Sequence, residues 1–354
     1  MVRPLRTVLA PFSWLYGLGA AARNAAFDTG LLRVRRATVP VISVGNLTAG
    51  GTGKTPLVEH IANALASSGR SVAVVSLGYG RRTRGVVVVS NRGNVLADAL
   101  AGGDEPVQIA RKFPALSVVV GERRIDAVTV AVRECGADVI VLDDAFQHRW
   151  IARDLDILVL DARRDPALEP ILPAGMRREW LSGMRRAALV GLSRSSAGEE
   201  PAWADGLPRG EGFRGTFAYR TVIRRFASFP GGEALGGEVL RGKRFIAVSG
   251  IGDHGSFLAS LEAEGVAVAA ERRFRDHHIY TEGDAAAIGR RAKGTDGVMT
   301  TEKDMVRLLA APAVARALGS VTPVAYAVAG IEILRGRATL DAAIARALGE
   351  GAAA

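Results

Sequence analysis

The sequence is poor in cysteine and in aromatic residues, and it contains no apolar run long enough to span a bilayer. Its single cysteine, Cys135, excludes a disulfide framework and fits a reducing compartment. Aromatic residues make up 6% of the chain, and no zinc-finger, helix-turn-helix or RNA-binding signature is present. The formal net charge of +10 therefore does not indicate a nucleic-acid partner, and we expect none.

The positive charge comes mainly from arginines spread through the chain, and three explanations fit it. An anionic membrane surface and a phosphorylated substrate would each attract such a protein. A GC-rich genome would also give an arginine-rich composition without any partner. The local motifs decide between these explanations.

Residues 41–57 read VISVGNLTAGGTGKTPL and predict a phosphate-binding loop. β-Branched residues indicate a buried strand, glycines end it, and a helical pattern begins at Lys54 and Thr55. Backbone N–H groups and the positive end of the helix would converge on an anion. Lys54 would reach the β and γ phosphates, and Thr55 would ligate Mg²⁺. The expected nucleotide-binding residues are Thr48, Ala49, Gly50, Gly51, Thr52, Gly53, Lys54 and Thr55.

Two positions in this loop depart from related patterns. The usual motif, G-x-x-x-x-G-K-[ST], has glycine at the place of Thr48. Partitioning-type ATPases carry a lysine where this chain has Ala49, which disfavours that class. A glycine-rich turn with a solvated lysine is the alternative, but it does not explain why Gly-Lys-Thr lies where strand changes to helix.

The chain of 354 residues is long enough for two domains with substantial cores. We predict an α/β fold like that of P-loop NTPases, a mostly parallel sheet with helices on both faces, plus a smaller C-terminal α/β domain. The strand-helix alternation is lost between 196 and 240 and resumes afterwards. The expected parts are a basic amphipathic segment (1–36), the P-loop core (37–212), a β-rich hinge (213–240) and the C-terminal domain (241–354).

Acidic residues follow a second strand pattern, ADVIVLDD, at Asp143 and Asp144. In phosphate-loop enzymes an acid at such a strand end completes the Mg²⁺ shell opposite the loop hydroxyl. Paired acids at a strand end can also be turn residues. Because the phosphate loop lies in the same chain, we favour metal binding.

Three other segments offer polar groups whose residue types alone do not settle their role. Tyr79 follows a strand pattern and precedes two arginines, which fits either a ligand-binding sheet edge or a solvated loop. Asp104 stands before a helical pattern, where it could cap the helix or act near a bound nucleotide. His277 lies in FRDHHIYT; a metal site would need more ligands, so an acid/base helper oriented by a carboxylate is the better interpretation.

The first 36 residues are rich in arginine and contain one acid, Asp28. Apolar residues recur there at near-helical spacing, and Trp14 and Tyr16 are types that favour the headgroup layer. We interpret the segment as an interfacial membrane anchor. A secretory signal peptide and a helix packed on the protein's own core are the alternatives.

A series of segments between residues 40 and 310 resembles, in order, the tetraacyldisaccharide 4′-kinases of lipid A biosynthesis. They are SVGNLTAGGTGKTPLV, LGYGRR, GGDEP, VLDDAFQH, DILVLDA, LPAG followed by RE, FRDHHIYT and TTEKDMVRL. The basic start with SWLYG also fits, so the resemblance covers nearly the whole chain. Thr48 is usual in this family. Ala145 replaces the family's usual glycine and GIGDHGSF lacks its usual proline, but neither change touches a group expected to do chemistry.

The resemblance implies transfer of the γ-phosphoryl group of ATP to the 4′-hydroxyl of a tetraacyldisaccharide 1-phosphate, giving lipid IVA. It implies Mg²⁺ held by Thr55 with one or both of Asp143 and Asp144. It also implies catalysis by Lys54, by Asp104 as the base and by His277 brought over through hinge closure. Further candidates for holding the disaccharide or aligning phosphates are Tyr79, Arg124, Gln147, His148, Arg178 and Glu179. The lipid substrate places the protein at the cytoplasmic face of the bacterial inner membrane, as a peripheral or monotopic protein.

A nucleotide-switched P-loop protein acting as a chaperone is the alternative function from another class. Guanine selectivity is usually signalled by N-K-x-D at a strand end, and this tetrapeptide does not occur in the chain. A basic nucleic-acid ATPase is a third possibility, with hydrolysis that depends steeply on salt. Neither accounts for the remaining motifs.

Overall fold

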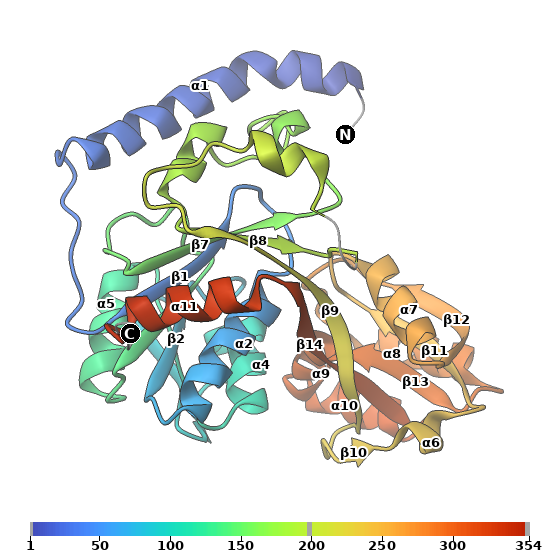
Figure 1. Ribbon diagram of the computed structural model, residues 1–354. Coiled ribbons are helices and arrows are strands. Elements are labelled where there is room, and N and C mark those ends of the chain that lie inside the picture. The colour runs from blue at the N-terminus through green and yellow to red at the C-terminus, as the bar shows by residue number, and fades with distance from the viewer. Residues whose placement is uncertain (1–2, 197–199, 351–354) are drawn as a thin grey trace.

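The computed structural model describes residues 3–196 and 200–350, which form a core lobe, a smaller C-terminal lobe and a long helix across the core (Figure 1). The long helix is α1 (Arg3–Asp28). The core lobe contains β1 (Val41–Asn46), α2 (Lys54–Ser67), β2 (Val72–Ser76), β3 (Val87–Asn91), β4 (Asn94–Val95), α3 (Ala99–Gly102), α4 (Asp104–Lys112), β5 (Ser117–Val120), α5 (Arg124–Arg133), β6 (Val139–Asp143), β7 (Leu155–Asp161), β8 (Leu189–Ser193) and the 3₁₀ helices η1 (Pro166–Leu168), η2 (Leu181–Arg186) and η3 (Ala202–Gly206). After it come β9 (Gly215–Ser228), β10 (Ala234–Leu235), α6 (Gly237–Leu240), β11 (Arg244–Ser249), α7 (His254–Ala263), β12 (Ala267–Arg273), α8 (Glu282–Ala292), β13 (Gly297–Thr301), α9 (Glu302–Leu309), α10 (Pro312–Gly319), β14 (Val324–Arg335) and α11 (Arg337–Ala347).

One continuous sheet runs through both lobes in the order β12-β11-β13-β14-β9-β8-β7-β1-β6-β2-β5-β3-β4. The strands from β8 to β5 are parallel, and so are those from β14 to β12. The two parallel halves meet at the antiparallel pair of β9 and β14. Because the carboxyl ends of the central parallel strands share one edge, the loops that follow β1, β6, β7 and β8 lie together there.

Helices cover both faces of the core sheet, which explains why its strands are apolar throughout rather than alternating. On one face α2, α4 and α11 bury residues such as Leu57, Ile109 and Leu340 against it. On the other face α5 packs through Ala127 and Ala131. The predicted fold, a mostly parallel α/β sheet with helices on both faces, is confirmed.

Two long strands connect the lobes. β9 leads out of the core lobe and β14 returns to it, so the chain crosses between the lobes twice (Figure 1). After β14 the last helix, α11, packs on β1, β7 and β9 of the core. The sequence-based division put residues 241–354 into one C-terminal domain; the structure returns α11 to the core lobe, because its apolar face covers strands there.

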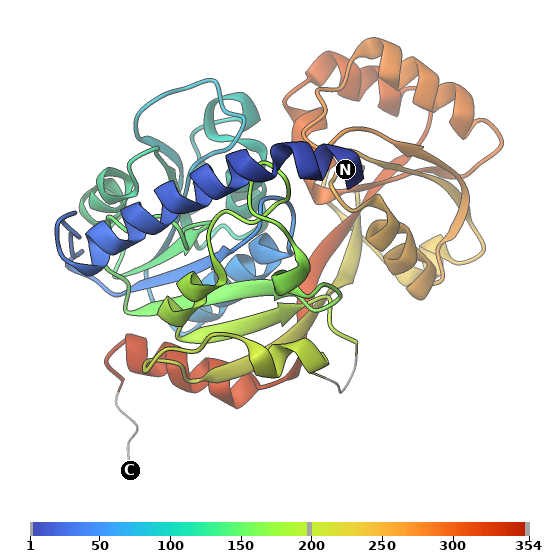
Figure 2. The ribbon, with the colours of Figure 1, turned by 90° about the horizontal axis from the view of Figure 1, so that it is seen from above.

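α1 lies along the surface of the core lobe and runs without interruption through Pro11 (Figure 2). It contacts the core at Gly17, where an added Cβ would lie 2.8 Å from the ring of Trp180. The Trp180 Nε1–H donates to the Gly17 carbonyl at 2.9 Å, and the Ser13 hydroxyl accepts from the Ala174 N–H at 3.0 Å. Within residues 3–196 and 200–350, no helix combines the length and apolar character needed to cross a bilayer.

Candidate active site

The turn after β1 has the backbone of a phosphate loop. Gly50 and Gly53 adopt φ values of 101° and 78°, which favour glycine, and α2 begins directly after Gly53. The Asn46 amide donates to the Thr52 hydroxyl at 3.0 Å, which ties the loop to the strand that carries it. Thr55 is the second residue of α2 and is half-buried at the helix start.

A cleft of 680 Å³ opens in front of this loop. The predicted loop residues Thr48, Ala49, Gly50, Gly51 and Thr52 line one side. Asp253, Arg273 and Asp276 of the C-terminal lobe line it too, and Asp253 forms ion pairs with Arg163 at 3.2 Å and Arg194 at 3.3 Å. A ligand in this cleft would therefore be within reach of both lobes.

Asp144 joins the phosphate loop to a second arginine-bearing segment. Its carboxylate lies 3.4 Å from Lys54 Nζ and accepts from Arg178 through both oxygens, at 3.0 and 3.1 Å. Burial alone would raise the pKa of Asp144, but the charges of Lys54 and Arg178 lower it below its ordinary value. Asp144 therefore stays ionised beside the loop lysine.

Asp143 is buried beside this pair, and its Oδ1 has no hydrogen-bond partner. Burial, with the charges of Glu105 and Asp144, raises its pKa to about 7. In the part of the chain that the structure describes, no three histidine, cysteine, aspartate or glutamate side chains gather into a metal site. Mg²⁺ in phosphoryl-transfer sites, however, takes only one or two carboxylates besides phosphate oxygens and water, so an unpartnered buried carboxylate beside Asp144 and Lys54 fits it.

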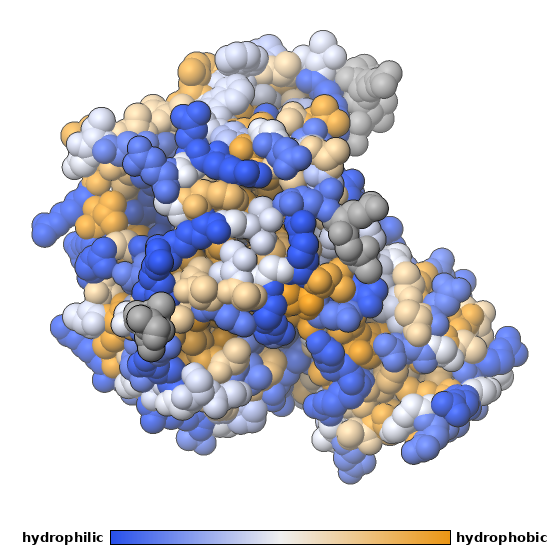
Figure 3. Space-filling model, viewed as in Figure 1, coloured by the Kyte–Doolittle hydropathy of each residue, from blue (hydrophilic) through white to orange (hydrophobic). Residues whose placement is uncertain are grey.

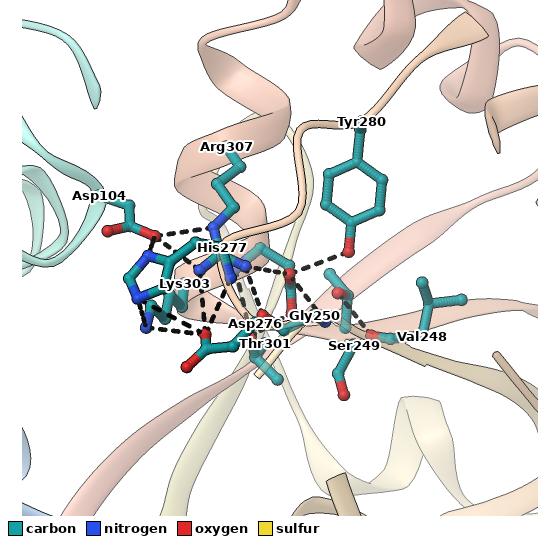
Figure 4. A network of polar contacts seen from close by, with 12 residues as sticks. Asp104, Val248, Ser249, Gly250, Asp276, His277, Tyr280, Thr301, Lys303 and Arg307 are labelled. Carbon is teal, nitrogen blue, oxygen red and sulfur yellow. Dashed lines mark hydrogen bonds and ion pairs between the residues drawn. The ribbon is translucent and has the colours of Figure 1, made fainter. Parts of the chain in front are cut away.

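Asp104 and His277 come from different lobes and meet at hydrogen-bond distance (Figure 4). His277 Nδ1 lies 3.0 Å from Asp104 Oδ2, and the same oxygen accepts from Arg307 Nε at 2.8 Å and Nη2 at 2.6 Å. Burial would raise the pKa of Asp104, but the His277 hydrogen bond and the charges of Arg307 and Lys303 hold it well below its usual range. Of the two neighbouring histidines it is His277 that reaches the core lobe, since His278 pairs with Asp284 at 3.0 Å.

Sequence reasoning missed Arg307 and gave Lys303 no specific role. Lys303 Nζ bonds Asp276 at 3.2 Å (Figure 4). It also bonds Glu105 at 2.9 Å, and Arg307 Nη1 bonds Asp304 at 3.0 Å. Lys303 and Arg307 are one helical turn apart, so they share a face of α9. That i, i+4 spacing within TTEKDMVRL was the available signal.

The predicted substrate residues divide into three groups. Gln147, His148 and Arg178 line a cavity of 460 Å³ together with Asp144, and α1 closes it with Tyr16 and Arg23 among its residues. Tyr79 lies elsewhere, with its ring 4.9 Å from that of His277.

Glu179 and Arg124 are buried. Glu179 is 0% exposed and accepts from Asn24 at 2.8 Å, Gln147 at 2.9 Å and Arg186 at 2.9 Å. It therefore fastens α1 and Gln147 to the core and does not line the cavity described above. Arg124 is 4% exposed, and its Nη1 donates to the Gly121 carbonyl at 2.7 Å.

A further cavity of 490 Å³ adjoins the first, since both include His148 and Trp150. Its charged lining consists of Arg33, Arg35, Arg123 and Arg124. Burial, with the charges of nearby arginines, lowers the pKa of His148 to about 4. This cavity is suited to a bound anion.

A phosphate loop with paired aspartates at the carboxyl edge of a parallel sheet, next to a pocket for a second ligand, defines a phosphotransferase of the P-loop class. A family model described as tetraacyldisaccharide-1-P 4′-kinase matches residues 5–348. The chain belongs to this tetraacyldisaccharide 4′-kinase family of lipid kinases, as the sequence resemblance implied.

Relatives and a solved structure agree over nearly the full length. The chain is 43% identical over 346 residues to a tetraacyldisaccharide 4′-kinase of Anaeromyxobacter dehalogenans, covering 97% of this chain and 89% of that protein. It is 39% identical over 329 residues to the protein of the same name from Chlorobaculum tepidum, covering 90% and 91%. The crystal structure of the "apo" form LpxK from Aquifex aeolicus in complex with ATP matches with a TM-score of 0.77, at 31% identity, covering 97% of this chain and 99% of that one.

Proposed function

We propose that this chain transfers the γ-phosphoryl group of ATP to the 4′-hydroxyl of tetraacyldisaccharide 1-phosphate, forming lipid IVA. One observation carries the proposal: Asp144 lines the cavity beside α1 and also lies 3.4 Å from the phosphate-loop lysine, Lys54. A sugar hydroxyl in that cavity and a nucleotide phosphate on the loop would therefore be neighbours. The family membership supports this choice of substrates.

The loop backbone and Lys54 hold the ATP phosphates in this proposal. Thr55, Asp143 and Asp144 are the residues that would hold Mg²⁺, which when bound neutralises phosphate charge. Lys54 leaves Asp144 for the phosphates, while Arg178 keeps that carboxylate in place. Because phosphoryl transfer depends mainly on positioning and charge neutralisation, these groups supply most of the rate acceleration.

Asp104 receives the hydrogen bond of the 4′-hydroxyl in this mechanism. His277 and Arg307 both bind Oδ2. Among the residues that the structure describes, Oδ1 accepts only from the neighbouring Glu105 N–H at 3.1 Å, so Oδ1 is the oxygen that can face the substrate. A carboxylate with a lowered pKa is a weak base, but a loose phosphoryl-transfer transition state requires little proton transfer. Tyr79 supports the His277 ring from the side.

The arginine-lined cavity takes the 1-phosphate of the acceptor. Arg33, Arg35 and Arg123 provide positive charge there, and none of these three side chains is buried. A multiply charged phosphate gains from several guanidinium groups at once.

The assay that tests the function uses purified protein in detergent micelles with γ-labelled ATP, Mg²⁺ and tetraacyldisaccharide 1-phosphate. We expect label in a chloroform-soluble product, and a higher KM for an acceptor that lacks the 1-phosphate. An equal KM for the two acceptors would remove the arginine cavity from the proposal. ATP consumption without lipid labelling would mean a wrong acceptor and would favour the nucleotide-switch alternative.

α1 anchors the protein to the cytoplasmic face of the inner membrane in this proposal, as a peripheral or monotopic contact. Its outward residues are apolar although they face solvent: Val8, Phe12, Trp14, Leu15 and Leu18 are 58% to 67% exposed. In Figure 3 the edge formed by α1 carries apolar side chains next to hydrophilic ones. This mixture suits the boundary between acyl chains and headgroups.

Replacing Phe12, Leu15 and Leu18 together by serine should release the protein from anionic vesicles. Each buried side chain of this size contributes about 1.5–3 kcal/mol, so the partition coefficient should fall more than about 100-fold. Vesicle flotation measures it, with Leu168→Ser as control because Leu168 is even more exposed (79%) but lies outside α1. Equal flotation of both variants and wild type would rule out the anchor.

A further inference from the structure

Lys112 lies at the C-terminal end of α4 and is completely paired in a nearly buried position. Its Nζ donates to Glu59 Oε2 at 2.8 Å, to Glu302 Oε2 at 2.8 Å and to the Ala329 carbonyl at 2.5 Å. Glu302 also accepts the Ala329 N–H at 2.8 Å, and Glu59 accepts from Gln108 at 3.0 Å. None of these side chains lines the nucleotide cleft or the cavity beside α1.

This cluster, Glu59, Lys112 and Glu302 with the Ala329 backbone, joins three helices and one connecting strand. Glu59 belongs to α2, which begins at the phosphate loop, and Lys112 to α4, which begins at Asp104. Glu302 is the first residue of α9, whose next turn carries the Asp104 partner Arg307. Each of the three helices therefore carries part of the candidate active site, and the cluster fixes them to one another.

Because the cluster buries three charged side chains, a gain in folding stability does not by itself explain it. Burial, together with the charge of Glu302, raises the pKa of Glu59 to about 7 although Lys112 opposes this. Burial would lower the pKa of Lys112, but the two carboxylates raise it above its ordinary value. Buried ion clusters are often no more stabilising than apolar residues of similar volume, whereas their directional bonds fix geometry.

α4 is held to the C-terminal lobe at both ends. Asp104 at its start binds His277 and Arg307, and Lys112 at its end binds Glu302 and the β14 backbone. The two contacts are eight residues apart, which is about 12 Å along the helix. Together the two contacts oppose rotation of α4 against α9. Because Lys303 of α9 lies 3.4 Å from His277 Nε2, they also hold Asp104 close to His277.

We propose that Lys112 is a positioning residue for phosphoryl transfer. The Glu59–Lys112–Glu302 cluster holds α4 against α9 and so keeps Asp104 in contact with His277. This inference rests on the proposed function of Asp104 and His277. Lys112 acts through these two residues and touches no substrate.

The test is a double-mutant cycle between Lys112→Met and His277→Ala in the lipid kinase assay. Lys112→Met keeps the length of the side chain and removes its charge and hydrogen bonds. We expect kcat to fall about 30- to 100-fold, because displacements of about 1 Å cost up to about 10²-fold, while KM for ATP changes less than about threefold. In the Lys112→Met background, His277→Ala should then lower kcat by less than about threefold, since the contact it removes is already lost.

Two outcomes overturn the proposal: a kcat of Lys112→Met within about threefold of wild type, or losses that multiply in the double variant. A Glu332→Gln variant is the matched control, because its ion pair with Arg220 at 2.8 Å joins β14, the strand that the cluster contacts, to β9 at the solvent-exposed surface. Its kcat should match wild type. If Lys112→Met does not unfold cooperatively, Glu302→Gln replaces it in the same cycle, because glutamine keeps an oxygen for the Ala329 N–H and removes the charge.

A second measurement does not depend on lipid phosphorylation. It therefore distinguishes an error in the positioning role of Lys112 from an error in the proposed function. Spin labels at the exposed positions Arg133 of α5 and Glu282 of α8, in a Cys135→Ala background, report the distance between the lobes. Lys112→Met should broaden the distance distribution, and Glu332→Gln should leave it unchanged. An unchanged distance distribution for Lys112→Met would contradict the positioning role of Lys112, even if wild type phosphorylated no lipid.

Discussion

Replacing Lys54 by alanine is expected to lower kcat for lipid phosphorylation by about 10³-fold, the loss typical of removing one preorganised charge from a transition state. Lys54 is the first residue of α2, and its side chain is only 11% exposed, so it is held at the end of the phosphate loop. The loop backbone remains, and KM for ATP should rise less than kcat falls, because the main-chain N–H groups still bind the phosphates.

The loss should be specific to this position. Lys293→Ala is the matched control, because Lys293 is an exposed lysine at the end of α8. This variant should keep wild-type kcat. Single-turnover mixing of enzyme, ATP and lipid isolates the chemical step from product release. A Lys54→Ala enzyme with wild-type single-turnover rate would contradict the assignment of the loop as the phosphoryl-transfer site.

The phosphate loop and Asp143–Asp144 could be predicted from sequence because each lies in one short stretch whose pattern determines its own conformation. A β-branched strand, glycines with positive φ and a helix start are local features. The order of the parallel strands then brings the two stretches to the same sheet edge. The fold class follows from the same strand-helix alternation.

The contact between Asp104 and His277 could not be derived in this way, because 173 residues separate the partners and the residue types alone fit a helix cap equally well. The resemblance to a family supplied that pairing. Arg307 was missed because an arginine within a helix looks like a solvated residue, whereas in the structure it is 8% exposed. Glu179 shows the opposite error, since a charged residue that looked available is buried among three donors.

The packing of α11 on the core lobe could not be predicted from the sequence either. The helix follows β14 directly, and a chain read in order assigns it to the domain that precedes it. Only the length of β14, which extends along β9 back to the core, determines that α11 packs there. The lobes are thus connected by two strands, and the chain's last helix packs on the core side of that connection.

Replacing Asp104 by asparagine is the other change with a large expected effect, because it removes both the proposed hydroxyl-binding carboxylate and a buried charge contact between the lobes. kcat should fall by about 10²- to 10⁴-fold, as for loss of an acid/base or hydroxyl-positioning group. Asparagine keeps the shape of the side chain but removes one of the two buried counter-charges of Arg307, since Asp304 remains. Stability at pH 7 should fall by about 3 kcal/mol, the loss typical of removing one partner from a buried ion pair.

The pH dependence of that stability difference follows from the direction of the Asp104 pKa shift. His277, Arg307 and Lys303 hold the pKa of Asp104 in the folded protein below its unfolded value of about 3.9. The contribution is therefore complete above about pH 4 and is lost as the pH falls through the folded-state pKa. Urea unfolding of wild type and Asp104→Asn should show a constant gap between pH 5 and 7 and a smaller one below pH 4. Asp341→Asn, in an exposed aspartate of α11, should show no gap at any of these pH values, and a gap for Asp104→Asn that widened in acid would reverse the sign of the assigned pKa shift.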